Sequence, residues 1–250
     1  MRRRDFLKGT GAALAYARPA AGQARPVSLA LDPRLSGPIQ WAASELEAAL
    51  TESGATVKRR PRPTEAPVDE FCITAEIGSG GAESVGLKPL AGRPGVAVVG
   101  GDARGAVYGL LELADRARHG SAIEFRQPVE ERPANAMRSV ARLFSSDVED
   151  KPWFNDREMW PQYLTMLATQ RFNRFNLSLS IGYDFLREVT DAYFLFPYPF
   201  LLAVPGYDVR ATNLPDAERD RNLETLKFIS DQTAMRGLEF QLGLWMHGYQ

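Results

Sequence analysis

The sequence has few of the residues that bind metals or form disulfides. Its 250 residues include one cysteine, Cys72, and two histidines, His119 and His247. A single cysteine excludes an intrachain disulfide, and so small a set excludes the usual Cys/His cages for zinc, iron–sulfur clusters or attached haem. We therefore expect no metal site and no cofactor, and a chemistry performed by carboxylates, hydroxyls and arginines.

An excess of charge of one sign is also lacking. The 30 basic residues nearly balance the 31 acidic ones, so no strong field attracts nucleic acid, and we expect no such partner. With 44% apolar and 24% charged residues, the chain is long enough for one large globular domain or two modest ones. The composition leaves the oligomeric state open.

The first 24 residues resemble an export signal. Residues 3–8 read Arg-Arg-Asp-Phe-Leu-Lys, and a mild apolar run follows at 9–17. This order resembles the twin-arginine motif, which a receptor reads, and Gly22-Gln23-Ala24 offers a small-x-small cleavage site. The apolar run is too short for a membrane span, which needs about 20 residues. The resemblance implies a periplasmic or secreted protein without a membrane partner after cleavage; the alternative is a basic tail with no targeting role.

Residues 25–131 combine short strands with two helices, which predicts a small α+β sandwich. Strands are expected at 27–31, 70–77, 95–99 and 122–125. One helix is expected to begin at Ser36 and to end at Gly54, and another to begin at Asp102 and to end at Gly120. The stretches 59–67 and 78–95 are rich in proline or glycine and are expected to be loops.

A glycine-rich segment, 100–105, lies between a predicted strand and a predicted helix, where phosphate-binding loops occur. A P-loop needs Gly-Lys-Ser/Thr where this chain has Gly105-Ala106-Val107, and the spacing G-x-G-x-x-G of dinucleotide sites is absent. We therefore expect these glycines to form a tight turn and to let the helix pack closely on the sheet.

The stretch 101–110 resembles a signature of known glycoside hydrolases. Asp102, Arg104, Gly105, Tyr108 and Gly109 follow the spacing Asp-x-Arg-Gly-x-x-Tyr-Gly. This signature is typical of the N-terminal domain of family 20 β-hexosaminidases, family 67 α-glucuronidases and related enzymes. In those families the domain is not catalytic and abuts a (β/α)8 barrel that carries the active site. The resemblance implies the same arrangement here.

Residues 132–250 alternate strands and helices. Strands are expected at 136–144, 173–180 and 238–246, and helices at 158–172 and 216–236. Such alternation predicts parallel βαβ units of α/β class, and the preceding domain favours the first three strands of a (β/α)8 barrel. A complete barrel takes about 250 residues, so we expect an N-terminal fragment of a longer enzyme. A doubly wound three-stranded sheet is the alternative.

The active site of a (β/α)8 barrel lies at the carboxyl ends of its strands, and this position suggests candidate substrate-binding residues. They are Arg138, Arg142, Asn176, Trp245 and His247. By resemblance to a hexosaminidase strand pattern, Arg138 matches an arginine that hydrogen-bonds sugar hydroxyls. Two arginines on one strand imply that carboxylates lie nearby or that the arginines line a substrate-binding opening of the barrel. The alternative is that one of them points outward and forms a salt bridge. Purely structural roles are the alternatives for the asparagine and the histidine.

Two loops could add to such a mouth. Polar residues at 145–150 follow the first barrel strand, and the connection 181–215 is far longer than usual. The second loop carries aromatic residues at 193–200 and Tyr207, whose rigid rings suit the apolar faces of sugars. Packing of these rings within the protein is the alternative.

The resemblance implies an exported glycoside hydrolase that acts on O-glycosidic bonds of an oligosaccharide or polysaccharide. Hydrolysis needs a carboxylic acid and a second group at the anomeric carbon. In the resembling families the acid lies at or beyond the fourth strand, so no catalytic residue is assigned here, Asp147 and Asp150 included. The alternatives are an exported carbohydrate-binding protein without hydrolysis and a twin-arginine redox enzyme.

Overall fold

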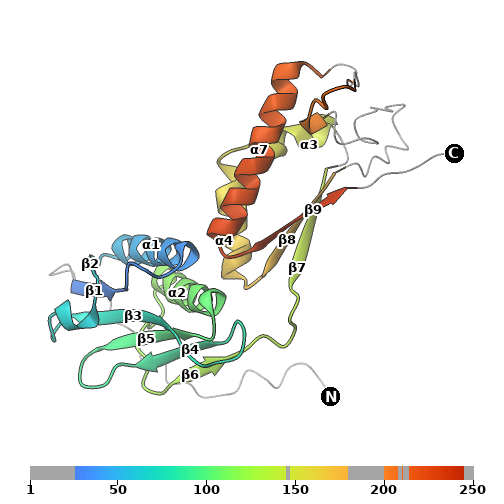
Figure 1. Cartoon of the computed structure of the whole chain (residues 1–250). Helices are drawn as coiled ribbons and strands as arrows, with labels where there is room; N and C mark the ends of the chain where they lie inside the picture. The colour runs from blue at the N-terminus through green and yellow to red at the C-terminus, as the bar shows by residue number, and fades with distance from the viewer. Residues whose placement is uncertain (1–25, 145–146, 180–199, 208–209, 211–213, 245–250) are drawn as a thin grey trace, which may run out of the picture.

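The computed structural model describes residues 26–144, 147–179, 200–207, 210 and 214–244. These residues form a six-stranded sheet followed by a three-stranded sheet, each with helices packed on one face (Figure 1). The predicted export signal, residues 1–24, lies outside the described residues. In the described part of the chain, no helix is both long and apolar enough to cross a membrane.

The first sheet is mixed. Its order is β2 (Thr56–Arg60), β1 (Pro26–Ala30), β3 (Phe71–Ile77), β5 (Gly95–Gly100), β4 (Val85–Pro89) and β6 (Val129–Glu131). The strands from β2 to β5 are parallel, whereas β4 pairs antiparallel with both β5 and β6. A short 3-10 helix, η1 (Pro63–Glu65), precedes β3.

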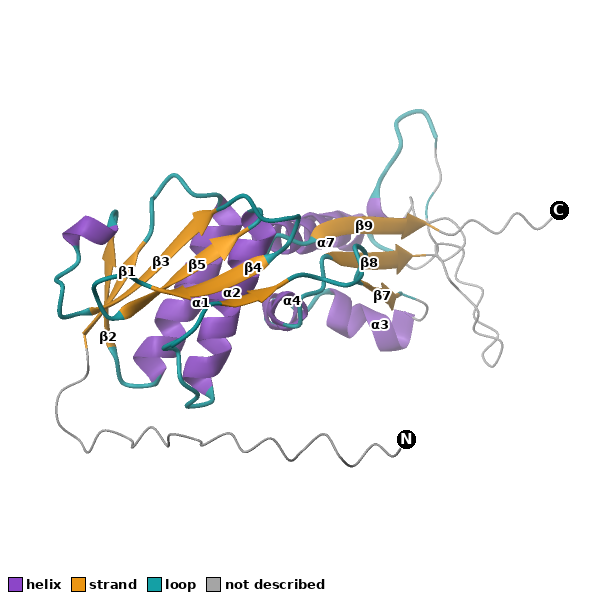
Figure 2. Ribbon diagram, turned by 90° about the horizontal axis from the view of Figure 1, so that it is seen from below, coloured by secondary structure: helices purple, strands orange, loops and turns teal. Residues whose placement is uncertain are grey.

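Two helices, α1 (Gly37–Glu52) and α2 (Ala103–Arg118), cover one face of this sheet (Figure 2). The predicted ends of both helices are confirmed. Asp102 Oδ1 accepts a hydrogen bond from the Gly105 backbone N–H at 2.8 Å, which caps α2. Gly54 and Gly120 have φ angles of 94° and 66°, which glycine adopts without strain after a helix.

Three sequence predictions for this sheet are wrong. Residues 122–125 form no strand; Ile123 and Phe125 instead pack against the core, so their alternation reflects packing and not a ladder. The stretch 59–67, expected to be a loop, includes the last two residues of β2, and the expected loop 78–95 contains all of β4. β2 is an edge strand rich in basic side chains, and β4 forms through its pairing with β5, so neither carries a strong local strand signal.

The second sheet is parallel throughout, in the order β7 (Ser139–Leu143), β8 (Arg174–Leu179) and β9 (Glu239–Leu244). Helices α3 (Asp147–Phe154) and α4 (Met159–Thr169) connect β7 to β8, and α7 (Asp216–Met235) precedes β9. The predicted parallel βαβ arrangement is therefore confirmed. Helix α3, which contains Pro152, was not predicted, because residues 145–150 were expected to form a loop.

Helices from the two sheets meet between them (Figure 1). Helix α2 contacts α4, and α1 contacts α7. Arg236, at the end of α7, is buried and stacks 5.0 Å from the ring centroid of Trp41 on α1. This burial lowers the pKa of Arg236 to about 10. The helix contacts therefore fix the two sheets against each other.

Candidate functional site

The candidate site lies where the three strands of the second sheet end. The register aligns one row of residues across the sheet and then a second row nearer the carboxyl ends: Ala141, Asn176 and Gln241, then Leu143, Ser178 and Gly243. Residues in register point to the same face of a sheet, so both rows share one face. The opposite face is apolar: Phe175 and Leu177 are fully buried there in the cluster that holds residues of α4 and α7. The helices cover the apolar face, and the opposite face, which carries Asn176, is called the polar face here.

Asn176 offers a hydrogen-bond donor on this polar face. Its Oδ1 accepts a hydrogen bond from Ser178 Oγ at 2.7 Å, and its Nδ2 donates to no other described residue. Gly243 keeps this position open, because a Cβ there would lie 2.5 Å from Ser178 Oγ and 3.2 Å from Asn176 Oδ1. The amide can therefore donate to a polar ligand, and its assignment to the substrate stays a prediction.

Arg142 lies on the other face of the same sheet. Its guanidinium stacks 4.1 Å from the ring centroid of Trp153 on α3 and 5.7 Å from that of Tyr163 on α4. Burial raises the pKa of Tyr163, and the Arg142 charge opposes that rise. The structure therefore separates Arg142 from Asn176 and seats it among helix residues.

Arg138 lies at the opposite end of the strands. It precedes the first residue of β7, so about 16 Å of extended chain separates it from the carboxyl end. Its guanidinium donates to the carbonyl oxygens of Arg171, at 2.6 Å, and Asn135, at 2.7 Å. The strand starts at Ser139 and runs away from Arg138, so this side chain lies at the amino end of β7 and not at the carboxyl end where the predicted site lies.

The remaining predicted residues divide between the described and undescribed parts. Trp245, His247 and most of the aromatic loop lie outside the described residues, so their roles stay predictions. Phe200 is buried, 5.2 Å from the ring of Phe144, and Tyr207 is 71% exposed. The first of these two rings is therefore core, and only the second is accessible.

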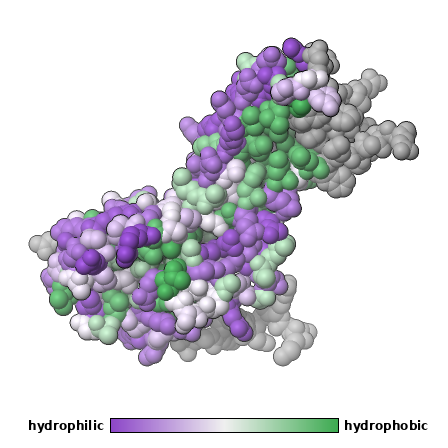
Figure 3. Space-filling view, viewed as in Figure 1, coloured by the Kyte–Doolittle hydropathy of each residue, from purple (hydrophilic) through white to green (hydrophobic). Residues whose placement is uncertain are grey.

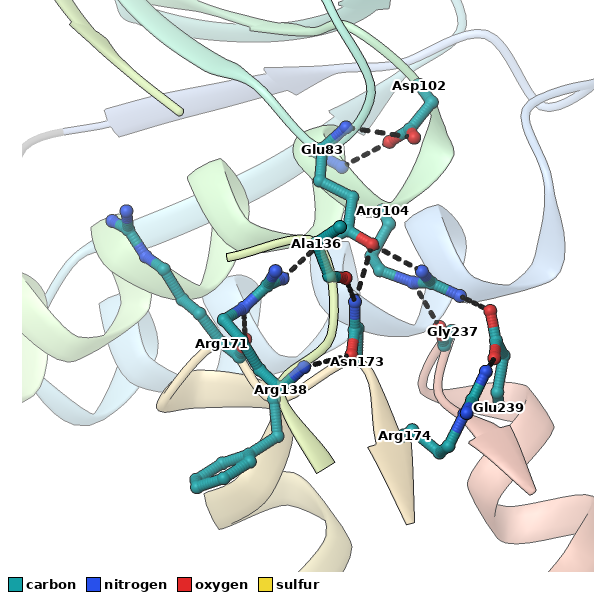
Figure 4. A network of polar contacts seen from close by, with 12 residues as sticks. Glu83, Asp102, Arg104, Ala136, Arg138, Arg171, Asn173, Arg174, Gly237 and Glu239 are labelled. Atoms are coloured by element: carbon teal, nitrogen blue, oxygen red, sulfur yellow. Dashed lines mark hydrogen bonds and ion pairs between the residues drawn. The ribbon is translucent and has the colours of Figure 1, made fainter. Parts of the chain in front are cut away.

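A buried carboxylate that the sequence did not reveal, Glu83, lies between the two sheets (Figure 4). Its side chain accepts hydrogen bonds from Arg138, from Arg104 at 2.5 Å and from Asn173 Nδ2 at 2.9 Å. Burial alone would raise the pKa of Glu83, but these three hydrogen bonds outweigh burial and lower it. Glu83 is therefore ionised and fully partnered at neutral pH.

The stretch that resembles a glycoside hydrolase signature lies around this carboxylate. Asp102 Oδ2 accepts from the Glu83 backbone N–H at 3.0 Å, and Arg104 also donates to the carbonyl oxygen of Gly237 at 2.8 Å. Tyr108 donates to the carbonyl oxygen of Phe172 at 3.2 Å. Burial, with the nearby Glu83 charge, raises the pKa of Tyr108 to about 12, so this hydroxyl keeps its proton.

The glycine-rich segment 100–105 was predicted to let the helix pack closely on the sheet, but Gly101 and Gly105 instead allow the loop 78–84 to approach closely. A Cβ on Gly105 would lie 2.1 Å from the carbonyl oxygen of Ser84, and one on Gly101 would lie 2.0 Å from that of Gly81. The loop 78–84 therefore rests directly on the start of α2. Sequence reasoning could have inferred that Arg104 needs a buried partner, but not that Glu83 supplies it.

No group of three or more histidine, cysteine, aspartate or glutamate side chains in the described ranges could hold a metal ion. The Cys72 thiol is buried, and burial raises its pKa, so it is protonated at neutral pH.

Comparison with known proteins gives two results. No model of a known protein family matches the sequence, and no curated protein matches it. Solved structures do match. A family 138 glycoside hydrolase that targets pectin rhamnogalacturonan II aligns with 85% of this chain and 30% of its own, at a TM-score of 0.63 and 21% identity.

Two other glycoside hydrolases align with similar extent. The family 84 protein CpGH84D covers 87% of this chain and 33% of its own, at a TM-score of 0.54 and 11% identity. A mutant Streptomyces plicatus β-hexosaminidase, solved with its product GlcNAc, covers 88% of this chain and 42% of its own, at a TM-score of 0.52 and 18% identity. This chain therefore spans between 30% and 42% of the length of these three structures, and it shares the fold of portions of glycoside hydrolases.

Proposed function

We propose that this chain carries the accessory domain, residues 25–131, and the first three strands of the (β/α)8 barrel, residues 132–250, of a glycoside hydrolase. The complete enzyme cleaves O-glycosidic bonds of an oligosaccharide or polysaccharide. The observation that carries the proposal is the order of the two sheets. A mixed sheet with helices on one face precedes three parallel strands with helices between them, and glycoside hydrolases align with 85% to 88% of the chain across both.

The surface of β9 supports a barrel that continues. Leu242 and Leu244 alternate with Gly243 and therefore point to the helix-bearing face, yet they are 36% and 53% exposed. Figure 3 shows apolar surface beside α7 in this region. In a (β/α)8 barrel, the helix that follows a strand covers such side chains, and a further strand pairs with its open edge.

The polar face of the second sheet supports a sugar as the ligand. Asn176, Ser178 and Gln241 bring amides and a hydroxyl to neighbouring strands. Neutral groups of this kind exchange hydrogen bonds with hydroxyls without a charge to neutralise. GlcNAc occupies the β-hexosaminidase that aligns with this chain, which favours a carbohydrate.

Hydrolysis of a panel of aryl glycosides tests the proposal. The complete protein, encoded by the reading frame that contains these 250 residues, should release the aryl group from at least one member. The 250-residue chain alone should release none, because it lacks the later strands that carry the acid in the barrel families it resembles. Saccharide binding without turnover by the complete protein would indicate a carbohydrate-binding protein instead. Visible absorbance or bound metal after purification would indicate a redox enzyme.

We also propose export through the twin-arginine route, on the strength of residues 3–8 alone. Replacing both Arg3 and Arg4 by lysine should retain the protein in the cytoplasm of a host that has this route. Periplasmic appearance of the double variant at the same rate as the original would contradict the proposal.

A further inference from the structure

Each strand of the second sheet begins at a residue tied to the first sheet. Arg138 precedes β7 and donates to Glu83 and, at 3.0 Å, to the Tyr108 hydroxyl. Asn173 precedes β8 and donates to Glu83 at 2.9 Å. Near the start of β9, the carbonyl oxygen of Gly237 accepts from Arg104, the same side chain that donates to Glu83.

The strand starts are also bonded to each other around this group. The Arg138 backbone N–H donates to Asn173 Oδ1 at 2.9 Å, and the Asn173 N–H donates to the carbonyl oxygen of Arg138 at 3.0 Å. The Glu239 N–H donates to the carbonyl oxygen of Asn173 at 2.9 Å. A displacement of the β8 start at Asn173 therefore strains the other two.

Charge alternates along the network that Figure 4 draws. The negative Glu83 pairs with the positive Arg104, which in turn pairs with Glu239. The Glu239 carboxylate lies 3.5 Å from Arg104 and 2.6 Å from Arg174. Glu83 is only 8% exposed and each of its partners is a donor. Loss of any one of the three donors would leave a buried oxygen of this carboxylate short of a hydrogen bond, so its geometry is strongly specified.

We propose that Glu83 is a positioning residue that pins the amino ends of β7, β8 and β9 to the first sheet, and that Arg104 and Tyr108 of the signature serve this contact. The accessory domain is then the base on which the parallel strands are aligned. The segment that resembles the signature then couples two parts of the chain. This inference is independent of the proposed function, since it concerns only contacts within the described residues.

Native-state hydrogen exchange of the 250-residue chain tests the inference. Three amides report on the pinned ends: Arg138, Asn173 and Glu239. The Phe144 amide, which donates to the Ser178 carbonyl oxygen at 2.8 Å, reports on the carboxyl end. Glu83→Gln keeps the side-chain shape and removes the charge. It should speed exchange at the three pinned amides about tenfold or more relative to Phe144, because charged hydrogen bonds are lost.

Two further variants complete the test. Glu130→Gln removes an exposed carboxylate that pairs with Lys88 on the same sheet, and it should leave all four amides unchanged. Tyr108→Phe removes one hydroxyl and should speed exchange at Arg138 about threefold or more relative to Phe144. This milder variant decides the question if Glu83→Gln does not fold. Unchanged exchange at the pinned amides, or an equal increase at Phe144, would overturn the inference.

Discussion

Replacing Asp102 by alanine removes two hydrogen bonds that join a helix start to the Glu83 turn. Asp102 Oδ1 accepts from the Gly105 N–H at 2.8 Å and Oδ2 accepts from the Glu83 N–H at 3.0 Å. Loss of the helix cap costs about 1 kcal/mol. Loss of the second bond leaves the backbone N–H of the buried Glu83 without its acceptor and costs about 1 to 2 kcal/mol. We expect the free energy of unfolding to fall by about 2 to 3 kcal/mol in urea titrations.

Two variants separate these contributions. Asp102→Asn keeps one acceptor oxygen and should cost about half as much as Asp102→Ala, because asparagine also caps helices well. Asp115→Ala changes an exposed carboxylate near the other end of α2 and should alter stability by less than about 0.5 kcal/mol. An Asp102→Ala cost no greater than that of Asp115→Ala would refute the capping and bridging roles.

Further predictions concern pH and packing. Because the folded state lowers the pKa of Glu83 below its ordinary value of 4.5, its ionisation stabilises the fold above that pH and this contribution is lost as pH falls below it. Urea titrations should therefore find the stability difference between the original chain and Glu83→Gln constant near neutral pH and smaller below about pH 4.5; a constant difference down to pH 3 would contradict the assignment. Gly105→Ala should cost about 1 to 3 kcal/mol by the same assay, because its Cβ would meet the Ser84 carbonyl oxygen at 2.1 Å. Gly37→Ala, with nothing within 4 Å of the new Cβ, is the matched control, and equal costs would exclude the close contact as the cause.

The parts of the fold that were predicted correctly are those determined by residues close together in the sequence. Helix ends at Ser36, Gly54, Asp102 and Gly120 depend on residues within one turn of the chain. The same holds for the strand and helix alternation after residue 132, where apolar periodicity changes from segment to segment. Edge strand β2 and the glycine-flanked β4 depend on partners far along the chain, so their own composition misled the prediction.

The candidate site was predictable only in part, for the same reason. Asn176 reaches the polar face because it alternates with buried Phe175 and Leu177, a pattern that the sequence displays. Arg138 and Arg142 look equivalent in sequence, yet one precedes the strand and the other points toward the helices. Glu83 lies in a glycine-rich loop, 55 residues from Arg138, and no neighbouring residue in the sequence indicates a contact between residues so far apart.

Saccharide binding at the carboxyl edge of the second sheet is tested most directly by titrating the complete protein with GlcNAc oligomers and pectin fragments. Asn176→Ala should weaken the affinity for the saccharide that binds by about 5- to 150-fold, as expected for the loss of a hydrogen bond worth about 1 to 3 kcal/mol. Arg138→Lys, at the amino end of β7, should leave the affinity unchanged in the folded protein. Weakened binding by Arg138→Lys together with unchanged binding by Asn176→Ala would place the saccharide at the wrong end of the strands and contradict the assignment.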